Sequence, residues 1–451
     1  MMRLNEEKRK SYAYILSLTI PIIIQNLFSA AVNSVDVLML NSVGQSSISA
    51  VSLATQYSNV LVNIFGGLGS GVSMLCAQYW GKQDIRAIER VQNIAFWFAC
   101  ITALLFAIPS IVIPELMMQV YTNDAELIQI GVGYLRIVGF SHLLWGIAET
   151  YFATLRSMEK VKISTSISVF TLLLNIFLNA VFIYGWFGAP KLGVMGVAIA
   201  TAFSRIVQFG MCLSVSRSSV DLRLRMFALS ASGNDLLKDF VRLSLPALVN
   251  TVVWSVGYSM YSAILGHISS DLIAANSIVS VVKSFGTVLC YAVSGASGIY
   301  VGKSIGANQM QKAKQDSKYA LILSVITGVI GGVIILVIAP FVLQAADFSE
   351  TAMYYLKMML LINSVYIMGT AVNSTLIAGV FRAGGDSKFG LVCDFIDMWC
   401  YAVPVGVLAA FVLKLPPMVV YVILCTDEFV KWPWVLKRYK SGKWLNNITR
   451  E

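Results

Sequence analysis

The residue best suited to ion chemistry is Asp36, which lies in a largely apolar stretch from Pro21 to Leu40. A carboxylate inside a membrane helix is costly in lipid, so it usually faces a cavity or a partner and serves function. There it can bind a cation or take up a proton, because burial disfavours its charged form. Pro21 lacks a backbone donor and is expected to bend this helix. Alternatively, Asp36 sits at the outer interface, but residues 37–40 continue the apolar run beyond it.

A second set of charged residues lies in apolar stretches nearer the carboxyl terminus. These residues are Lys283, Asp394 and Asp397. The two aspartates are three residues apart and therefore share one helix face. A buried lysine needs a carboxylate partner, and we expect Asp397 to pair with Lys283. Two interpretations stay open: a structural ion pair that locks two helices, or a second proton or substrate-gating site. Asp427 and Glu428 precede a basic tail, which suggests that they reach the membrane interface.

Membrane helices must position these residues, because the composition does not fit a soluble domain. The chain has 451 residues, of which 57% are hydrophobic and 12% charged, whereas soluble domains have about 25% charged residues. The net charge of +10 is expected to set orientation rather than to bind nucleic acid. Seven scattered cysteines and two histidines form no disulfide framework or metal motif. Without a Walker sequence or a catalytic triad, we expect no enzyme and no cofactor beyond a coupling ion.

A membrane span needs roughly 20 apolar residues, and twelve stretches qualify. They are 12–40, 47–78, 91–113, 125–153, 163–187, 193–215, 241–266, 271–301, 317–342, 351–380, 389–413 and 417–436. Of the 33 Lys and Arg residues, 27 lie in the termini and in every second loop, whereas the opposite loops hold two. This alternation predicts twelve spans with both termini in the cytoplasm.

The spans divide into two sets of six. The expected parts are an amino-terminal lobe at 1–215, a cytoplasmic linker at 216–240, a carboxyl-terminal lobe at 241–440 and a cytoplasmic tail at 441–451. One constant shift along the chain, without a gap, places Pro21 on Pro246 and Gly81 on Gly306. Parallel repeats of this kind build many transporters, with the substrate path between the halves. An old duplication without a transport role is the alternative.

The chain resembles the multidrug and toxic compound extrusion (MATE) transporters over roughly residues 12 to 440. The matching features are the Pro21-to-Asp36 spacing, the loop opened by Gly81, NIFLNAVFIYG at 175–185, GVMGVAIATAF at 193–203, and RAGGD at 382–386. The resemblance implies an all-α polytopic membrane protein with 12 transmembrane helices in two pseudo-symmetric six-helix lobes. We expect the lobes to face each other in a V around a central cavity.

Carried over by position, the family's amino-terminal site implies Asp36, Asn175, Asn179 and Thr201 here. Asn175 and Asn179 are four residues apart in an apolar span, so both should point into the protein from one helix face. These oxygen ligands suit Na⁺, whereas Asp36 alone suits a proton; hydrogen bonding between helices is the structural alternative. Asn179 is often aspartate in the family. The site here has one formal negative charge, which leaves H⁺ and Na⁺ open.

In one branch of the family the carboxyl-terminal lobe also carries coupling carboxylates. Their positions are held by Trp254 and Ala371 in this sequence. We therefore expect coupling to depend on the amino-terminal lobe.

The resemblance implies an antiporter that exports cationic or amphiphilic organic compounds in exchange for H⁺ or Na⁺. We expect small-molecule organic cations as partners, a monomer, and a place in the bacterial cytoplasmic (inner) membrane. The alternative is a lipid-linked oligosaccharide flippase, which shares this architecture. A flippase should offer several basic cavity residues to a pyrophosphate, and Lys283, Arg205 and Arg136 are the candidates. A membrane-embedded enzyme is not supported.

Overall fold

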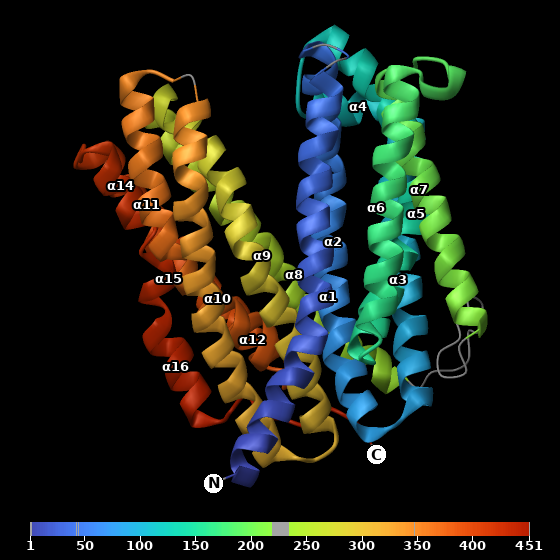
Figure 1. Cartoon of the computed structure of the whole chain (residues 1–451), viewed down its shortest axis with the longest axis vertical. Helices are drawn as coiled ribbons and strands as arrows, with labels where there is room; N and C mark the ends of the chain where they lie inside the picture. The colour runs from blue at the N-terminus through green and yellow to red at the C-terminus, as the bar shows by residue number, and fades with distance from the viewer. Residues whose placement is uncertain (1, 42, 44, 219–233, 347, 451) are drawn as a thin grey trace. The chain divides into compact units, whose positions relative to one another are not determined.

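The structure is a computed structural model, shown in Figure 1. It describes the backbone at residues 2–41, 43, 45–218, 234–346 and 348–450. Side chains are described at the same positions except 2–11, 30, 33, 34, 36–38, 41, 45 and 234. Within these ranges every regular element is a helix, which confirms the predicted all-α class. Most of the predicted linker at 216–240 lies outside the described residues.

The first half of the chain forms seven α-helices and one short 3₁₀ turn within the described residues. They are α1 (Met2–Asn41), α2 (Gln45–Lys82), α3 (Ile85–Val112), α4 (Pro114–Gln119), α5 (Ala125–Ser157), α6 (Val161–Tyr184), η1 (Trp186–Gly188) and α7 (Val194–Ser218). Capping side chains fix where some of them begin. Asp84 Oδ1 accepts a hydrogen bond from Ala87 N at 2.9 Å before α3, and Asp124 Oδ1 accepts one from Glu126 N at 2.9 Å before α5.

The second half contains nine α-helices and three π-helical stretches among the described residues. They are α8 (Asn234–Ile268), α9 (Ser270–Gly306), α10 (Met310–Ala345), α11 (Glu350–Asn373), η2 (Ser374–Phe381), α12 (Ser387–Phe395), η3 (Ile396–Ala402), α13 (Val403–Val407), η4 (Leu408–Val412), α14 (Pro417–Leu424), α15 (Asp427–Val430) and α16 (Trp432–Ser441). Across the described chain, eleven helical segments are long and apolar enough to cross a membrane. They correspond to the first eleven predicted spans.

The predicted twelfth span at 417–436 is a broken helix, not a continuous one. It is divided among α14, α15 and α16. The charged residues in it, Asp427, Glu428 and Lys431, are 1%, 3% and 2% exposed. Backbone interruptions at membrane depth are tolerated where protein surrounds them. The expectation that Asp427 and Glu428 reach the membrane interface is therefore wrong, because both carboxylates are enclosed by protein.

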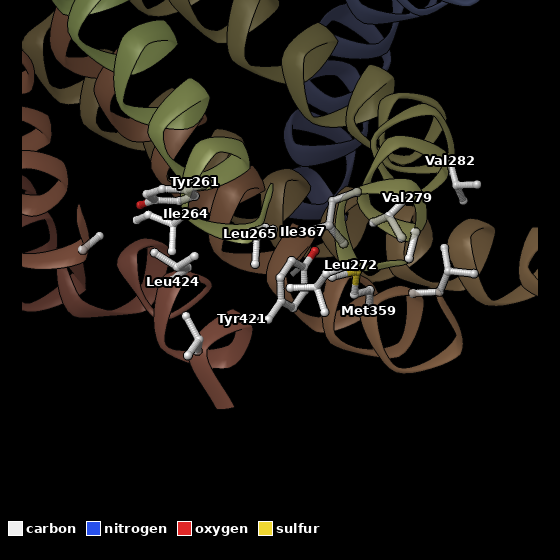
Figure 2. Close-up of a cluster of buried hydrophobic side chains, with 14 of the residues drawn as sticks. Tyr261, Ile264, Leu265, Leu272, Val279, Val282, Met359, Ile367, Tyr421 and Leu424 are labelled. Atoms are coloured by element: carbon white, nitrogen blue, oxygen red, sulfur yellow. The ribbon is translucent and has the colours of Figure 1, made fainter. Parts of the chain in front are cut away.

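The chain forms two compact units. The amino-terminal unit comprises Ile24–Cys76 and Asp84–Ser244, and the carboxyl-terminal unit comprises Met1–Ile23, Ala77–Gln83 and Leu245–Glu451. A hydrophobic cluster in the amino-terminal unit joins α1, α2, α5, α6 and α7. The cluster in the carboxyl-terminal unit joins α8, α9, α11 and α14 among others, and part of it is drawn in Figure 2. α1 and α2 each contribute to both units.

Gly81 and Gly306, the two glycines that the internal repeat matches, meet in the carboxyl-terminal unit where α2 approaches α9. A Cβ on Gly81 would lie against the carbonyl oxygen of Lys303, and a Cβ on Gly306 against that of Gln78. Gln78 and Lys303 are matched by the same shift, so the contact is reciprocal. Small residues permit such close approach of helix backbones in membrane proteins.

Candidate functional site

A stripe of buried polar side chains runs along one face of α6 in the amino-terminal unit. Its members recur every three or four residues and are at most 8% exposed: Ser164, Ser168, Thr171, Asn175 and Asn179. That spacing places them on one helix face, turned into the unit. Three of them, the two serines and Thr171, were not predicted as site residues, although the same spacing signal is present in the sequence.

At the carboxyl-terminal end of this stripe, Asn175 and Asn179 form a chain of hydrogen bonds with Thr201, which we call the amide ladder. Asn179 Nδ2 donates to Asn175 Oδ1 at 3.4 Å, and Asn175 Nδ2 donates to Thr201 Oγ1 of α7 at 3.4 Å. The three residues named from the sequence are therefore brought together. Both contacts are long for hydrogen bonds, which typically measure 2.7–3.2 Å. Amide and hydroxyl oxygens are hard ligands of the kind that suit a small cation.

α1 runs beside the polar stripe of α6. Gln25 Nε2 donates to Ser168 Oγ at 3.1 Å. Further along both helices, Met39 and Leu40 of α1 belong to the same buried cluster as Ala180 and Ile183 of α6. From the first set of contacts to the second, the residue numbers increase in both helices. α1 and α6 therefore run in the same direction within this unit. Gln25 was not predicted as a site residue. Its hydrogen bond to Ser168 sets the register between α1 and α6.

This register is informative for position 36. Asp36 and Asn179 each lie eleven residues beyond the Gln25–Ser168 contact, and helices rise equally per residue. We therefore expect position 36 to fall level with Asn179. Val32, Met39 and Leu40 of α1 are 3–8% exposed, so these three side chains of α1 are buried. The side chain of Asp36 lies outside the described residues, and its predicted role stays a prediction.

Pro21, the predicted bend, lies inside α1, which continues through it as one helix. The compact units divide two residues later, between Ile23 and Ile24. Whether the helix bends there during transport stays a prediction.

The charged residues of the carboxyl-terminal unit gather around Lys431. Its ammonium lies 3.2 Å from Asp394, 3.6 Å from Asp397 and 3.1 Å from Glu428. All four side chains are at most 8% exposed. Asp394 and Asp397 do face one partner, as their spacing predicts. That partner is Lys431, which was not identified as a candidate from the sequence.

The expected pairing of Lys283 with Asp397 is wrong. The Lys283 ammonium instead lies over two aromatic rings, 4.1 Å from the centre of Tyr366 and 4.8 Å from that of Tyr258. Lys431 occupies the position beside Asp397 because the break between α15 and α16 turns it inward. Nothing in a hydropathy profile marks that break.

Asn250 and Arg382 extend the cluster around Lys431. Asn250 Nδ2 donates to Asp394 Oδ2 at 2.7 Å, and Arg382 Nη2 donates to Asn250 Oδ1 at 2.7 Å. Burial lowers the pKa of the Arg382 guanidinium, and the nearby Asp394 carboxylate opposes that shift. A guanidinium remains charged through such shifts, so Asp394 is stabilised by Lys431 directly and by Arg382 through an amide.

The long apolar helices and the buried polar groups between them define a polytopic α-helical membrane transport protein. The family model described as MatE matches residues 21–181 and 246–408. The chain belongs to the MATE family. The two matched segments begin at Pro21 and Pro246, the pair of prolines that the internal repeat superposes, so the family match agrees with the repeat.

Curated relatives and solved structures agree with this assignment. The chain is 22% identical to the uncharacterized transporter YisQ of Bacillus subtilis, over 96% of this chain and 94% of YisQ. It is 25% identical to the probable multidrug resistance protein YoeA of Bacillus subtilis, over 89% of this chain and 88% of YoeA. A structure of a mutant of the Vibrio cholerae MATE transporter VcmN superposes with a TM-score of 0.86 at 16% identity, over 97% and 99% of the two chains.

Proposed function

We propose that this protein is a secondary active antiporter that exports cationic or amphiphilic organic compounds in exchange for inward H⁺ or Na⁺. Family membership and a relative named as a probable multidrug resistance protein support export of small molecules. The observation that carries the coupling proposal is the amide ladder of α6 and α7, whose two asparagines are buried.

In this proposal Asp36 is the group that takes up the ion. Asn175, Asn179 and Thr201 supply neutral oxygens around a Na⁺ ion, or hydrogen bonds around a protonated carboxyl. Loading neutralises the carboxylate and so changes what the ladder bonds to, which alters the packing of α1 against α6. A site with one carboxylate works with either ion, since a proton needs no further ligand and Na⁺ takes several hard oxygens.

The proposal is tested by Asp36→Asn in cells that lack other efflux pumps. We expect ethidium efflux to fall to the background rate, because an amide neither binds nor releases a proton and holds a cation weakly. Glu115→Gln, which neutralises an exposed carboxylate on α4 of the same unit, should leave efflux unchanged. Full gradient-driven efflux by Asp36→Asn would refute the coupling role.

We also propose that both termini lie in the cytoplasm of a bacterium and that the protein works as a monomer in the inner membrane. The alternation of basic loops supports this orientation. A fluorescent protein that folds only in the cytoplasm, fused to the carboxyl terminus, should therefore fluoresce. A periplasmic phosphatase fused there should be inactive, and the reverse pair of results would refute the orientation.

The flippase alternative is less well supported. Arg205 Nη1 donates to Ser141 Oγ at 2.9 Å, and its guanidinium lies 5.0 Å from the Trp145 ring centre. A guanidinium held in this way is already engaged within its own unit, which leaves less basic surface for a pyrophosphate.

A further inference from the structure

Acids outnumber bases in a buried cluster of the carboxyl-terminal unit. Four carboxylates that are at most 6% exposed interact there, and they are Asp394, Asp397, Asp427 and Glu428. Among the described residues, the cations that act on them are Lys431, Lys283 through Asp427, and Arg382 through Asp394. With every group ionised, this set keeps one negative charge without a cation. A buried charge of that kind is costly, and the uptake of one proton removes it.

Three of the four carboxylates are held by neutral hydrogen-bond donors. Asp394, Asp427 and Glu428 each accept a hydrogen bond from a side chain without a charge. The donors are, in the same order, Asn250 at 2.7 Å, Tyr261 at 3.0 Å and Asn373 at 2.6 Å. Hydrogen bonds to a carboxylate favour its charged form, so these three groups are suited to stay ionised.

Asp397 is the exception. It is 0% exposed, and neither of its oxygens accepts a hydrogen bond from a described residue. The ammonium of Lys431 lies 3.6 Å from Asp397 Oδ2, which is too far for a hydrogen bond. The same ammonium is closer to Asp394, at 3.2 Å, and to Glu428, at 3.1 Å. Burial without donors disfavours a carboxylate, so the missing proton of the cluster belongs on Asp397.

The charged and titratable groups that face Asp397 come from several elements. Asp394 and Cys393 lie on α12, Asp427 and Glu428 on α15, Lys431 directly after α15, and Tyr261 on α8. α13, which also packs against this segment, has no titratable residue. Three carboxylates therefore disfavour a charge on Asp397, and the ammonium of Lys431 alone favours it.

The backbone around Asp397 is irregular. Asp397 lies in the π-helical stretch η3, and Lys431 lies at the break between α15 and α16. π-helical turns are frequent at functional sites, and interrupted membrane helices form the ion sites of many transporters. The Asp394 side chain is 8% exposed, more than those of the other three residues around the ammonium. Asp394 is therefore the entrance through which a proton can reach Asp397.

We propose that Asp397 is a proton-binding site of the carboxyl-terminal unit, with Lys431 as the group that responds to the proton. When Asp397 is protonated, Lys431 neutralises Asp394 and Glu428, to which it is already closer. When the proton leaves, Asp397 competes with both for the same ammonium. The inference goes beyond the proposed function, since it places a second ion-binding group in the unit opposite to that of the amide ladder.

Infrared difference spectroscopy of the full-length protein in detergent tests the proposal. A protonated carboxyl group has a carbonyl stretching band that an ionised carboxylate lacks. We expect wild type to lose one such band as the pH rises beyond the range in which exposed carboxyl groups titrate. Asp397→Asn should lack this change, whereas Glu350→Gln, which neutralises an exposed acid on α11 of the same unit, should keep it. Identical spectra of wild type and Asp397→Asn would overturn the proposal.

A second variant tests the role of Lys431 without removing it. Asp394→Asn takes away a neighbouring negative charge and leaves more of the ammonium to Asp397. The band of Asp397 should therefore disappear at a pH lower by about one unit. An unshifted transition in Asp394→Asn would show that the balance around Lys431 does not hold the proton, which would also overturn the proposal.

Thermal unfolding gives an independent measurement of the same proton. A proton that binds the folded state more tightly than the unfolded state stabilises the fold, and this stabilisation is lost as the pH rises. Wild type should lose stability through the infrared transition, and Asp397→Asn should show no such loss; parallel curves would contradict the inference. Neither measurement needs transport, so Asp36→Asn should behave as wild type in both. The two proposals can therefore fail separately.

Discussion

Lys431 holds three carboxylates close to its ammonium, but they are not equally compensated. Asp394 also accepts from Asn250 at 2.7 Å, and Glu428 also accepts from Asn373 Nδ2 at 2.6 Å. Asp397 lies furthest from the lysine, is 0% exposed, and neither of its oxygens accepts a hydrogen bond in the described part of the chain. A buried charge without donors is costly, so Asp397 is the least stable charge of the cluster.

This difference predicts opposite stability effects. Asp397→Asn should raise the free energy of unfolding in detergent by about 1–2 kcal/mol, because it removes a poorly compensated charge without changing volume. Lys431→Met should lower it by roughly 3–5 kcal/mol, because it leaves three carboxylates without their cation. Lys437→Met, an exposed change on α16, should have little effect. A loss of stability in Asp397→Asn as large as that in Lys431→Met would contradict the conclusion that Asp397 is the least stable charge of the cluster.

In the proposed amino-terminal site, we expect Asn179 to decide which ion couples transport. Asn179→Asp adds a second carboxylate one helical turn from Asn175, and cation affinity rises with the number of charged ligands. We expect the variant to show about tenfold higher apparent affinity for Na⁺ in efflux assays at fixed pH. Asn179→Leu should lose coupling altogether. An unchanged Na⁺ dependence in Asn179→Asp would mean that this position does not contact the ion.

At the scale of elements, the reciprocal glycine contact between α2 and α9 should be intolerant of any side chain. Gly81→Ala and Gly306→Ala should each lower stability in detergent by roughly 1–3 kcal/mol, because a methyl group meets backbone and not a movable side chain. Gly66→Ala and Gly295→Ala, on the same two helices, have no atom near the added carbon and should be neutral. Thermal unfolding of the four variants compares them directly, and equal effects would disprove the close contact.

The sequence predicted those elements whose signal is local. Hydropathy located eleven spans, and four-residue spacing was enough to place Asn175 and Asn179 on one buried face of α6. The break of the twelfth span was missed because hydropathy averaged over the length of a whole span conceals the charged turn between Thr426 and Lys431. The pairing of Lys431 with Asp394 and the Gln25–Ser168 contact between α1 and α6 were not predictable, since both depend on which helices are neighbours in space.

At the scale of the whole molecule, the carboxyl-terminal segment ties distant parts of its unit together. Trp444 is 1% exposed. Beyond it, Gln78 Nε2 donates to Asn446 O at 3.0 Å, Ile448 N donates to Gln78 Oε1 at 2.8 Å, and Lys82 donates to the Arg450 carbonyl. The end of α2 is thereby fastened to the end of the chain.

Stepwise truncation should test whether the contacts of the carboxyl-terminal segment with α2 stabilise the protein. Removal of residues 446–451 should lower the thermal unfolding temperature by a few degrees, because Gln78 loses two partners. Removal of 444–451 should lower it much further, because Trp444 leaves a cavity against Phe381 and Tyr439, whose ring centres lie 6.4 and 6.1 Å away. Truncated proteins that unfold at the wild-type temperature would show that the segment is not fastened in solution.

The central claim is that an inward ion flux through the Asp36 site drives export, and reverse coupling tests it most directly. Purified protein in liposomes is given an ethidium gradient alone, and H⁺ and Na⁺ movements are recorded separately. We predict that ethidium movement drives one of the two ions in the opposite direction in wild type, and that Asp36→Asn moves neither. Ethidium flux in wild type without any opposing ion flux, or equal ion flux in Asp36→Asn, would contradict the account.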